Sequence, residues 1–271
     1  CESFDHKREG ADSFTSSIAH PSKTIRGLME NRPLNTPGFT DRMTRGELIA
    51  AAIYLPIHVV GIPFGISWLA EALPWLYTLS NTQLNVICYG LGLAFVLIGL
   101  RGWLRRSFDA ALDAKGRFLL GIVGGYAVNI ALSFVIGALI LLLGIELGSS
   151  PNNEAVMAES ATQMGRIAVV TVVMAPMVEE PLFRGLLFGC IRPRSRVLAY
   201  AVSALAFALY HVWQYIYVSG DFSLLVYCLS YLPASFALAW AYERGGGIWS
   251  SIALHAVMNA LSVYVLSGAG Y

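Results

Sequence analysis

The sequence predicts an all-α fold, a polytopic bundle of about seven to eight transmembrane helices. Of its 271 residues, 56% are hydrophobic and only 13% are charged, with a mean hydropathy of +0.61, whereas soluble domains carry about 25% charged residues. Apolar runs recur along the chain, each near the roughly 20 residues that cross a bilayer. This composition excludes a water-soluble enzyme with a polar shell and a disordered protein. The net charge of +1 offers no basic field, so we expect no nucleic-acid partner.

The chain divides into a polar lead and an apolar domain. Residues 1–46 are rich in Ser, Thr, Pro and Gly and carry mixed charges. Such a segment cannot bury enough apolar surface to form a core, so we expect it to be mostly disordered. Residues 47–271 are predicted to form the transmembrane helical domain.

The apolar runs are predicted to be helices, because a spanning segment must satisfy its own backbone hydrogen bonds. The third run is long enough to tilt or to break at Gly124 and Gly125, and a further surface or re-entrant helix could form near 105–116. The seven predicted spans lie near 48–70, 85–104, 118–145, 167–190, 197–217, 223–242 and 248–267.

Loop charge predicts the orientation in the membrane. With seven alternating crossings, the N-terminal lead and every second loop fall on one side, and of the 18 Lys and Arg residues only Arg166 falls on the other. Positively charged loops stay in the cytoplasm. We therefore expect a multi-pass protein of the cell membrane with a cytoplasmic N-terminus.

Polar residues inside the apolar runs gather in the last four spans. Ionisable side chains are costly in a membrane and usually line a functional cavity. At about 1.5 Å per residue, four of them lie roughly 11–21 Å from the cytoplasmic ends of their helices (Glu179, His211, His255 and Asn259), which predicts one shared site. His58 and Asn129, in the first three spans, are expected only to pack helices together. The clustered residues are Glu179, Glu180, Arg184, His211, His255 and Asn259.

Spacing separates the roles of the two neighbouring acids. Glu180 and Arg184 are four residues apart, in the order that favours an ion pair on a helix. Glu179 is rotated by about 100° and does not share that face. One carboxylate is therefore predicted to be tied to Arg184, while its neighbour stays available as a base. Pro176 and Pro181 flank the acids and predict a kink there.

Three motifs carry a family resemblance. Residues 179–184 (EEPLFR) match EExxxR, residues 207–211 (FALYH) match FxxxH, and residues 255–259 (HAVMN) match HxxxN. In this order, on successive membrane helices, they resemble the CPBP family. That family comprises CAAX prenyl proteases and bacteriocin-processing or immunity proteins and is also called the Abi family. The resemblance covers about 164–266.

The resemblance implies an intramembrane endopeptidase of the glutamic type, similar to the type II CAAX prenyl protease, with a cavity open to the cytoplasm. In such enzymes the residues that correspond to Glu179 and His211 activate water. Those that correspond to His255 and Asn259 hold the oxyanion. A carboxylate in an apolar wall is a competent general base, and donors in a dry site stabilise an oxyanion.

The remaining residues of the motifs receive supporting roles. The Glu180–Arg184 pair is expected to lock two helices together even in an active enzyme, which leaves catalysis to Glu179. Phe207 is expected to form a wall of the substrate-binding site rather than to take part in the chemistry.

No cofactor is predicted. Two His and two Glu could bind zinc, but the acids lack the HExxH helix of zinc proteases. The four cysteines lie far apart and show no metal-binding spacing. The expected partners are the lipid bilayer and a peptide or protein substrate, which could be lipidated or embedded in the membrane.

A non-hydrolytic protein is the alternative. The same midplane Glu and His residues could relay protons in a proton-coupled transporter, or the polar cluster could bind a partner's transmembrane segment. The sequence shows no internal repeat of the kind common in transporters, and Asn259 is suited to an oxyanion site. Both observations favour hydrolysis.

Overall fold

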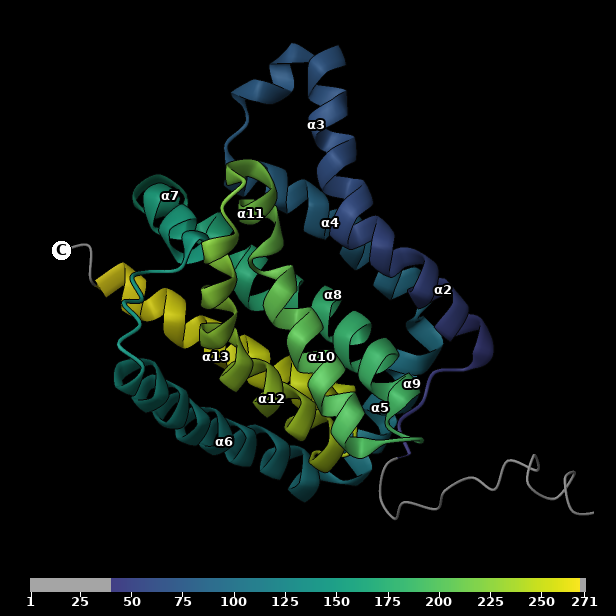
Figure 1. The fold of residues 1–271 in the computed structure, drawn as a ribbon. Helices are drawn as coiled ribbons and strands as arrows, with labels where there is room; N and C mark the ends of the chain where they lie inside the picture. Colours follow the sequence, from purple (N-terminus) through teal and green to yellow (C-terminus); the bar gives the residue numbers. More distant parts are fainter. Residues whose placement is uncertain (1–39, 269–271) are drawn as a thin grey trace, which may run out of the picture. The chain divides into compact units, whose positions relative to one another are not determined.

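The computed structural model describes residues 40–268 of the chain and is helical over most of that range, with no strand in it (Figure 1). Five helices or helix runs within it are long and apolar enough to cross a membrane. The protein is thus a multi-pass membrane protein with the predicted all-α architecture. These five spans cover Arg45–Ala72, Asn81–Gly99, Lys115–Leu142, Phe222–Arg244 and Ile248–Val265.

The first two spans begin at side-chain caps. Thr44 caps α2 (Arg45–Pro56) and Ser80 caps α4 (Asn81–Gly99), each in a reciprocal capping box. The first span is one path in which α2 is followed by η1 (Ile57–Gly61), a π-helical turn, and then α3 (Ile62–Ala72). A short helix, η2 (Pro74–Thr78), leads on to α4.

The surface helix expected near 105–116 is present as α5 (Arg101–Asp113). It precedes α6 (Lys115–Leu142), which is a single unbroken helix, so the suggested break at Gly124 and Gly125 does not occur. These glycines instead permit close packing. A Cβ on Gly124 would lie 2.6 Å from the Trp240 ring, and one on Gly125 would lie 2.5 Å from Leu254.

Two of the predicted spans are broken. The segment expected at 167–190 is divided among five short elements, and the one expected at 197–217 is two helices bent by 43°. The first of the five elements is the end of α7 (Pro151–Ala168). The other four are η3 (Val169–Met174), α8 (Ala175–Glu180), η4 (Pro181–Phe188) and α9 (Gly189–Ile191). The bent pair is α10 (Arg196–Tyr210) and α11 (Trp213–Ser219), which η5 (Phe222–Tyr227) connects to α12 (Cys228–Arg244) and α13 (Ile248–Gly268).

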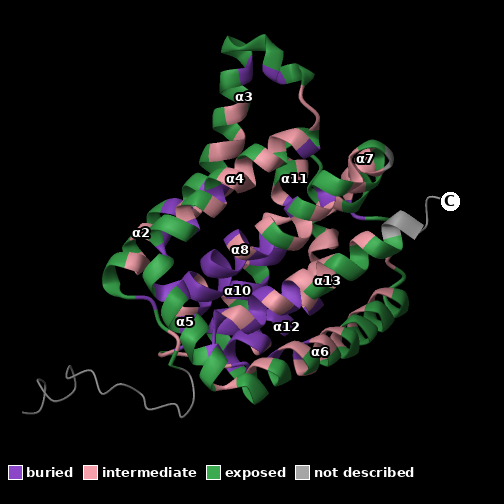
Figure 2. Cartoon of the chain, turned by 180° about the vertical axis from the view of Figure 1, so that it is seen from behind, coloured by how far each residue is buried: buried purple, intermediate pink, exposed green. Residues whose placement is uncertain are grey.

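The protein core lies around α8, α10 and α12. Figure 2 shows buried residues concentrated on these helices, whereas α3 and α6 are mainly exposed. Helix α12 packs against α6, α10 and α13, and α13 in turn packs against α8. The helices that carry the three sequence motifs therefore form the centre of the bundle.

The described end of the polar lead, residues 40–46, contacts the helical domain. Asp41 accepts hydrogen bonds from Trp103 Nε1 (2.7 Å), Ser107 Oγ (3.0 Å) and the backbone N of Ile248 (2.9 Å). Burial raises the pKa of this carboxyl, against the effect of those hydrogen bonds. Met43 is buried as well. Residues 1–39, which hold most of the lead, lie outside the described residues.

Candidate active site

The two acids lie on a single turn and a half of α-helix between two π-helical segments. Pro176 and Pro181 carry no backbone N–H, so each removes a helix hydrogen bond. The chain adopts wider turns in η3, before α8, and in η4, which begins at Pro181. Such π-helical turns occur frequently at functional sites. Both Glu179 and Glu180 are buried here.

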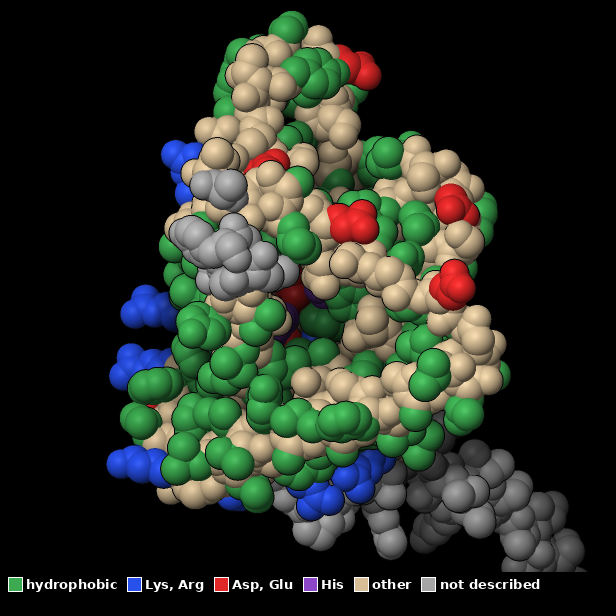
Figure 3. Space-filling model, turned by 90° about the vertical axis from the view of Figure 1, so that its left-hand side faces the viewer, with side chains coloured by type: hydrophobic (Ala, Val, Ile, Leu, Met, Phe, Trp, Pro, Cys, Tyr) green, Lys and Arg blue, Asp and Glu red, His purple; other side chains and the backbone are tan. Residues whose placement is uncertain are grey.

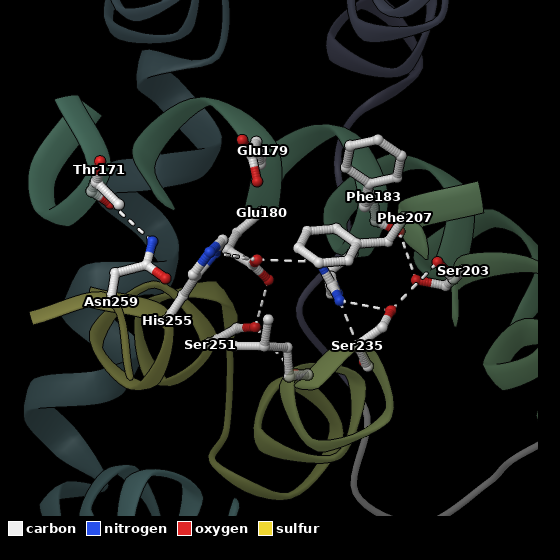
Figure 4. Close-up of polar contacts among 12 residues, drawn as sticks. Thr171, Glu179, Glu180, Phe183, Ser203, Phe207, Ser235, Ser251, His255 and Asn259 are labelled. Carbon is white, nitrogen blue, oxygen red and sulfur yellow. Dashed lines mark hydrogen bonds and ion pairs between the residues drawn. The ribbon is translucent and has the colours of Figure 1, made fainter. Parts of the chain in front are cut away.

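Glu180 is the centre of a buried hydrogen-bond network in which both of its carboxylate oxygens have partners (Figure 4). Its Oε1 accepts from Arg184 Nη1 at 3.0 Å and pairs with His255 Nδ1 at 2.8 Å, while its Oε2 accepts from Ser251 Oγ at 2.5 Å. The Glu180–Arg184 ion pair predicted from the spacing is present, and neither side chain is exposed. A carboxylate with this many partners is held in place.

Arg184 connects the network to two further helices. Its Nη2 donates to Ser235 O (3.1 Å) and Ser235 Oγ (2.9 Å) on α12. Its guanidinium carbon lies 4.2 Å from the ring centroid of Phe207 on α10, an arrangement that stabilises a cation. Phe207 is only 2% exposed. It therefore packs between Arg184 and the histidines and presents little surface to a ligand.

Glu179 has a different environment from its neighbour. Its Oε1 accepts a hydrogen bond of 2.6 Å from Tyr89 Oη on α4. Its Oε2 is buried and has no hydrogen-bond partner among the described residues. Figure 4 shows Glu179 apart from the dashed contacts that surround Glu180. Of the two acids, only Glu179 therefore has a carboxylate oxygen available to a further group.

His211 lies at the break between α10 and α11. Its Nδ1 is 2.9 Å from Phe207 O, and because a carbonyl only accepts, Nδ1 carries the hydrogen. The Nε2 of a neutral ring is then an acceptor. The ring stacks on Tyr231 with centroids 4.5 Å apart, and it lies 4.5 Å from the Phe207 centroid.

The two residues of the third motif are held separately. His255 is bound to Glu180, and its ring lies 5.8 Å from that of Phe207. Asn259 donates one Nδ2 hydrogen to Thr171 O at 2.7 Å, which leaves the second hydrogen free to act. No hydrogen bond between Asn259 and His255 is present among the described residues. The expectation that both side chains converge on one point thus remains a prediction.

Several polar contacts were not found from the sequence. Tyr89 and Ser251 each bond directly to one of the two acids. His58, expected only to pack helices, contacts Tyr210 Oη, which in turn contacts Tyr89. A tyrosine or a serine in an apolar run has no distinctive spacing. The one feature of the sequence that could have pointed to Tyr89 and Ser251 is a hydroxyl group at about the same depth in the membrane as the two acids.

The described residues do not provide a metal site. No group of three or more His, Cys, Asp or Glu side chains within them is arranged to hold an ion. Glu180 is occupied by Arg184 and Ser251, and His211 Nδ1 bonds to a backbone carbonyl. The expectation of no cofactor and the zinc alternative both remain predictions.

One face of the molecule is hollowed. Figure 3 shows a recess in it with acidic and histidine side chains at its base. Of the three histidines in the described residues, His58 and His211 lie within electrostatic reach of Glu179.

Membrane-spanning helices and a buried cluster of Glu, His and Arg are compatible with a membrane peptide hydrolase, and comparison with known proteins supports this class. Residues 163–261 match the family model of the type II CAAX prenyl endopeptidase Rce1-like proteins. The match contains all three motifs and confirms the resemblance predicted from them.

Two curated proteins are similar to the chain over about two thirds of its length. "UPF0177 protein YxdF" of Lactococcus lactis subsp. lactis is 27% identical over 170 residues, which are 62% of this chain and 86% of YxdF. "Putative membrane peptidase YdiL" of Bacillus subtilis is 24% identical over 182 residues, 66% of this chain and 69% of YdiL. No solved structure gives a significant match.

Proposed function

We propose that the protein hydrolyses a peptide bond at the membrane by a glutamic-type mechanism in which Glu179 is the general base. The observation that carries the proposal is the contrast between the two acids: Glu180 is fully bonded, whereas Glu179 Oε2 is buried without a partner. A carboxylate oxygen that no donor occupies is free to take a proton from water in general-base catalysis.

In the first step, Glu179 takes a proton from a water molecule as the water oxygen bonds to the substrate carbonyl carbon. His211 Nε2 accepts a hydrogen bond from the same water and orients it. When the tetrahedral intermediate collapses, the C–N bond breaks and the proton on Glu179 passes to the departing amine. Atoms and charges then balance, and the carboxylate is restored.

The oxyanion is stabilised by His255 and Asn259. Asn259 offers its second Nδ2 hydrogen, since the first is bound to Thr171 O. His255 directs Nδ1 to Glu180, so its Nε2 donates to the oxyanion when the ring carries a hydrogen on both nitrogens. Each such hydrogen-bond donor to the oxyanion stabilises the transition state by about 3 kcal/mol.

The substrate is a peptide or protein that carries an apolar group near the scissile bond. An apolar pocket of about 400 Å³ includes Phe183 and Tyr210 in its wall, together with Leu55, Val59 and Leu209. Tyr210 contacts Tyr89, which bonds to Glu179. A prenyl chain, as in the substrates of the matched family, or an apolar transmembrane residue would suit this pocket.

Cleavage assays on the protein in nanodiscs test the proposal. The probes are two quenched fluorescent peptides of the same CAAX-type sequence, one farnesylated and one not. Glu179→Gln should lose at least about 10³-fold in kcat, because the base is removed. Glu71→Gln, an exposed acid on α3, is the matched control and should retain full activity. Cleavage by Glu179→Gln within a few-fold of the unmodified protein would refute the proposal.

A further inference from the structure

A line of hydrogen bonds leads from the first membrane span to Glu179. His58 Nε2 lies 3.2 Å from Tyr210 Oη, Tyr210 Oη lies 3.1 Å from Tyr89 Oη, and Tyr89 Oη lies 2.6 Å from Glu179 Oε1. The four residues belong to η1, α10, α4 and α8, so segments far apart in the sequence meet here. His58 and Tyr89 both lie outside the residues that match the family model.

The number of available hydrogens fixes the direction of this line. Each phenol carries a single O–H. Tyr89 donates its hydrogen to Glu179, so Tyr210 must be the donor in the contact between the two tyrosines. Since the hydrogen of Tyr210 is then used, His58 must donate from Nε2. All three donors point toward the carboxylate, and bonds aligned in this way strengthen one another.

The reverse direction is unfavourable. A proton on Glu179 Oε1 would turn every donor around and would place the histidine hydrogen on Nδ1. That nitrogen is buried and has no hydrogen-bond partner among the described residues. Orphaned buried N–H groups are rarer in proteins than under-satisfied acceptors. Oε1 therefore stays an acceptor throughout.

We propose that His58, Tyr210 and Tyr89 form a positioning chain that holds Oε1 of Glu179 and assigns the acceptance of the water proton to Oε2. This inference rests on the proposed hydrolytic function. In the reaction, the water proton bonds to Oε2 as the oxygen–carbon bond forms. The same proton leaves Oε2 for the amine nitrogen when the C–N bond breaks, while Tyr89 keeps its bond to Oε1.

The local helix geometry supports this role. Pro56 lies inside the end of α2, and the chain widens into the π-helical turn η1 directly after it. His58 lies on that turn and is only 5% exposed. Its ring lies 5.7 Å from that of Tyr89 and 5.9 Å from that of Tyr210. The widened turn thus brings a hydrogen-bond donor to the tyrosine pair from a span that carries no family motif.

Other groups around Glu179 influence the ionisation of its carboxyl and must be kept constant in a test. Glu180 is adjacent in sequence. The charged or titratable side chains within electrostatic reach of Glu179 are His58, Tyr89, Arg184, Tyr210, His211 and Tyr231. Substitution of a tyrosine by phenylalanine changes one hydroxyl and leaves the formal charge of this set unaltered at neutral pH.

Tyr89→Phe is the principal test, with the full-length protein in nanodiscs and the farnesylated quenched peptide as probe. We expect kcat to fall about 10- to 100-fold, because a hydrogen bond to a charged group is lost, while KM changes less than about twofold. The acid limb of the pH profile of kcat/KM should move to higher pH by about one to two units. Tyr210→Phe should shift it in the same direction by less. His58→Gln, which keeps an N–H donor, should retain more activity than His58→Leu.

Tyr54→Phe is the matched control. Tyr54 is a buried tyrosine on α2 whose ring lies 5.7 Å from that of His58, but its Oη has no hydrogen-bond partner among the described residues. Its loss should leave kcat and the pH profile unchanged. Equal effects of Tyr54→Phe and Tyr89→Phe would show a general packing defect and overturn the inference.

Infrared titration gives a readout that needs no substrate. The band of the protonated Glu179 carboxyl is assigned by its loss in Glu179→Gln, and its appearance is followed as the pH is lowered. In Tyr89→Phe the midpoint should move to higher pH by the same one to two units. An unshifted midpoint, with Glu179→Gln still inactive, would overturn the positioning chain and leave the proposed function intact. Activity in Glu179→Gln would instead overturn the proposed function.

Discussion

The surroundings of Glu180 and of Glu179 differ in how completely they are bonded, although the two acids are adjacent in sequence. Glu180 binds an arginine, a histidine and a serine from three directions, and it links α8 to α12 through Arg184 and to α13 directly. Glu179 has one tyrosine partner and one unpartnered oxygen. A saturated carboxylate stabilises the fold, whereas an unsaturated one retains the basicity that a reaction requires.

The largest effect should follow from breaking the Glu180 network. Arg184→Ala leaves a buried carboxylate without its cation, and removal of one partner of a buried ion pair costs about 3–5 kcal/mol. We expect a loss of that size in the free energy of unfolding, measured by denaturant titration in detergent micelles. Arg194→Ala, at an exposed site near the end of the same segment, is the control and should be close to neutral. A similar stability for both variants would contradict a structural role for Glu180.

Conservative substitution of each acid sharpens the comparison. Glu180→Gln removes the charge that balances Arg184 and should cost about 3 kcal/mol, the lower end of that range, because the amide oxygen still accepts one bond. Glu179→Gln should cost less, about 1 kcal/mol, because only its single bond from Tyr89 is altered, while it abolishes cleavage. Unfolding and cleavage are measured in parallel on the two variants. If Glu179→Gln lost stability and Glu180→Gln lost only cleavage, Glu179 would be the structural acid and Glu180 the base.

The packing of α6 against α12 and α13, the helices that contact Arg184 and Glu180, can be tested by substitution of its glycines. A Cβ on Gly121 would lie 2.7 Å from Gly245 Cα and 2.8 Å from Ser250 Cβ, so Gly121→Ala overpacks the contact of α6 with α12 and α13. Such overpacking costs about 1–3 kcal/mol. Gly137→Ala on the same helix meets nothing within 4 Å and should be neutral or slightly stabilising. Thermal unfolding of the pair distinguishes close packing from mere helix propensity.

The smallest effect should come from a carboxylate near the surface. Glu159 accepts hydrogen bonds of 2.9 Å from the backbone N of Asn81 and of Thr82 at the start of α4. Burial raises its pKa, but these bonds and one from the Thr82 side chain bring it below the usual 4.5. Its stabilisation is therefore complete above about pH 4.5 and is lost as the pH falls through the lowered pKa.

Glu159→Gln should consequently lose about 0.5 kcal/mol at neutral pH and show a weaker pH dependence of stability below about pH 4.5. Glu154→Gln, exposed on the same helix, supplies the control. If the stability of the two variants depended on pH in the same way below about pH 4.5, Glu159 would not stabilise the start of α4.

Sequence reasoning predicted the membrane class, the burial of the acids and the Glu180–Arg184 pair, since hydropathy and i,i+4 spacing are local properties. It could not predict that His211 lies at a 43° break, because the bend depends on packing of α10 and α11. Nor could it find Tyr89 or Ser251, whose partners lie 90 and 71 residues away. The contacts of residues 40–46 were missed for the same reason: Asp41 is held by Trp103, Ser107 and Ile248.

The dependence of Glu180 on α13 affects biogenesis as well as the folded state. Ser251 and His255 lie on α13, and Ser251 follows Glu180 by 71 residues along the chain. Until α13 has entered the bilayer and packed against α8, Glu180 lacks two of its three side-chain partners. The Glu180 network is therefore completed only when α13 is in place, so the final position of α8 is fixed late in membrane insertion.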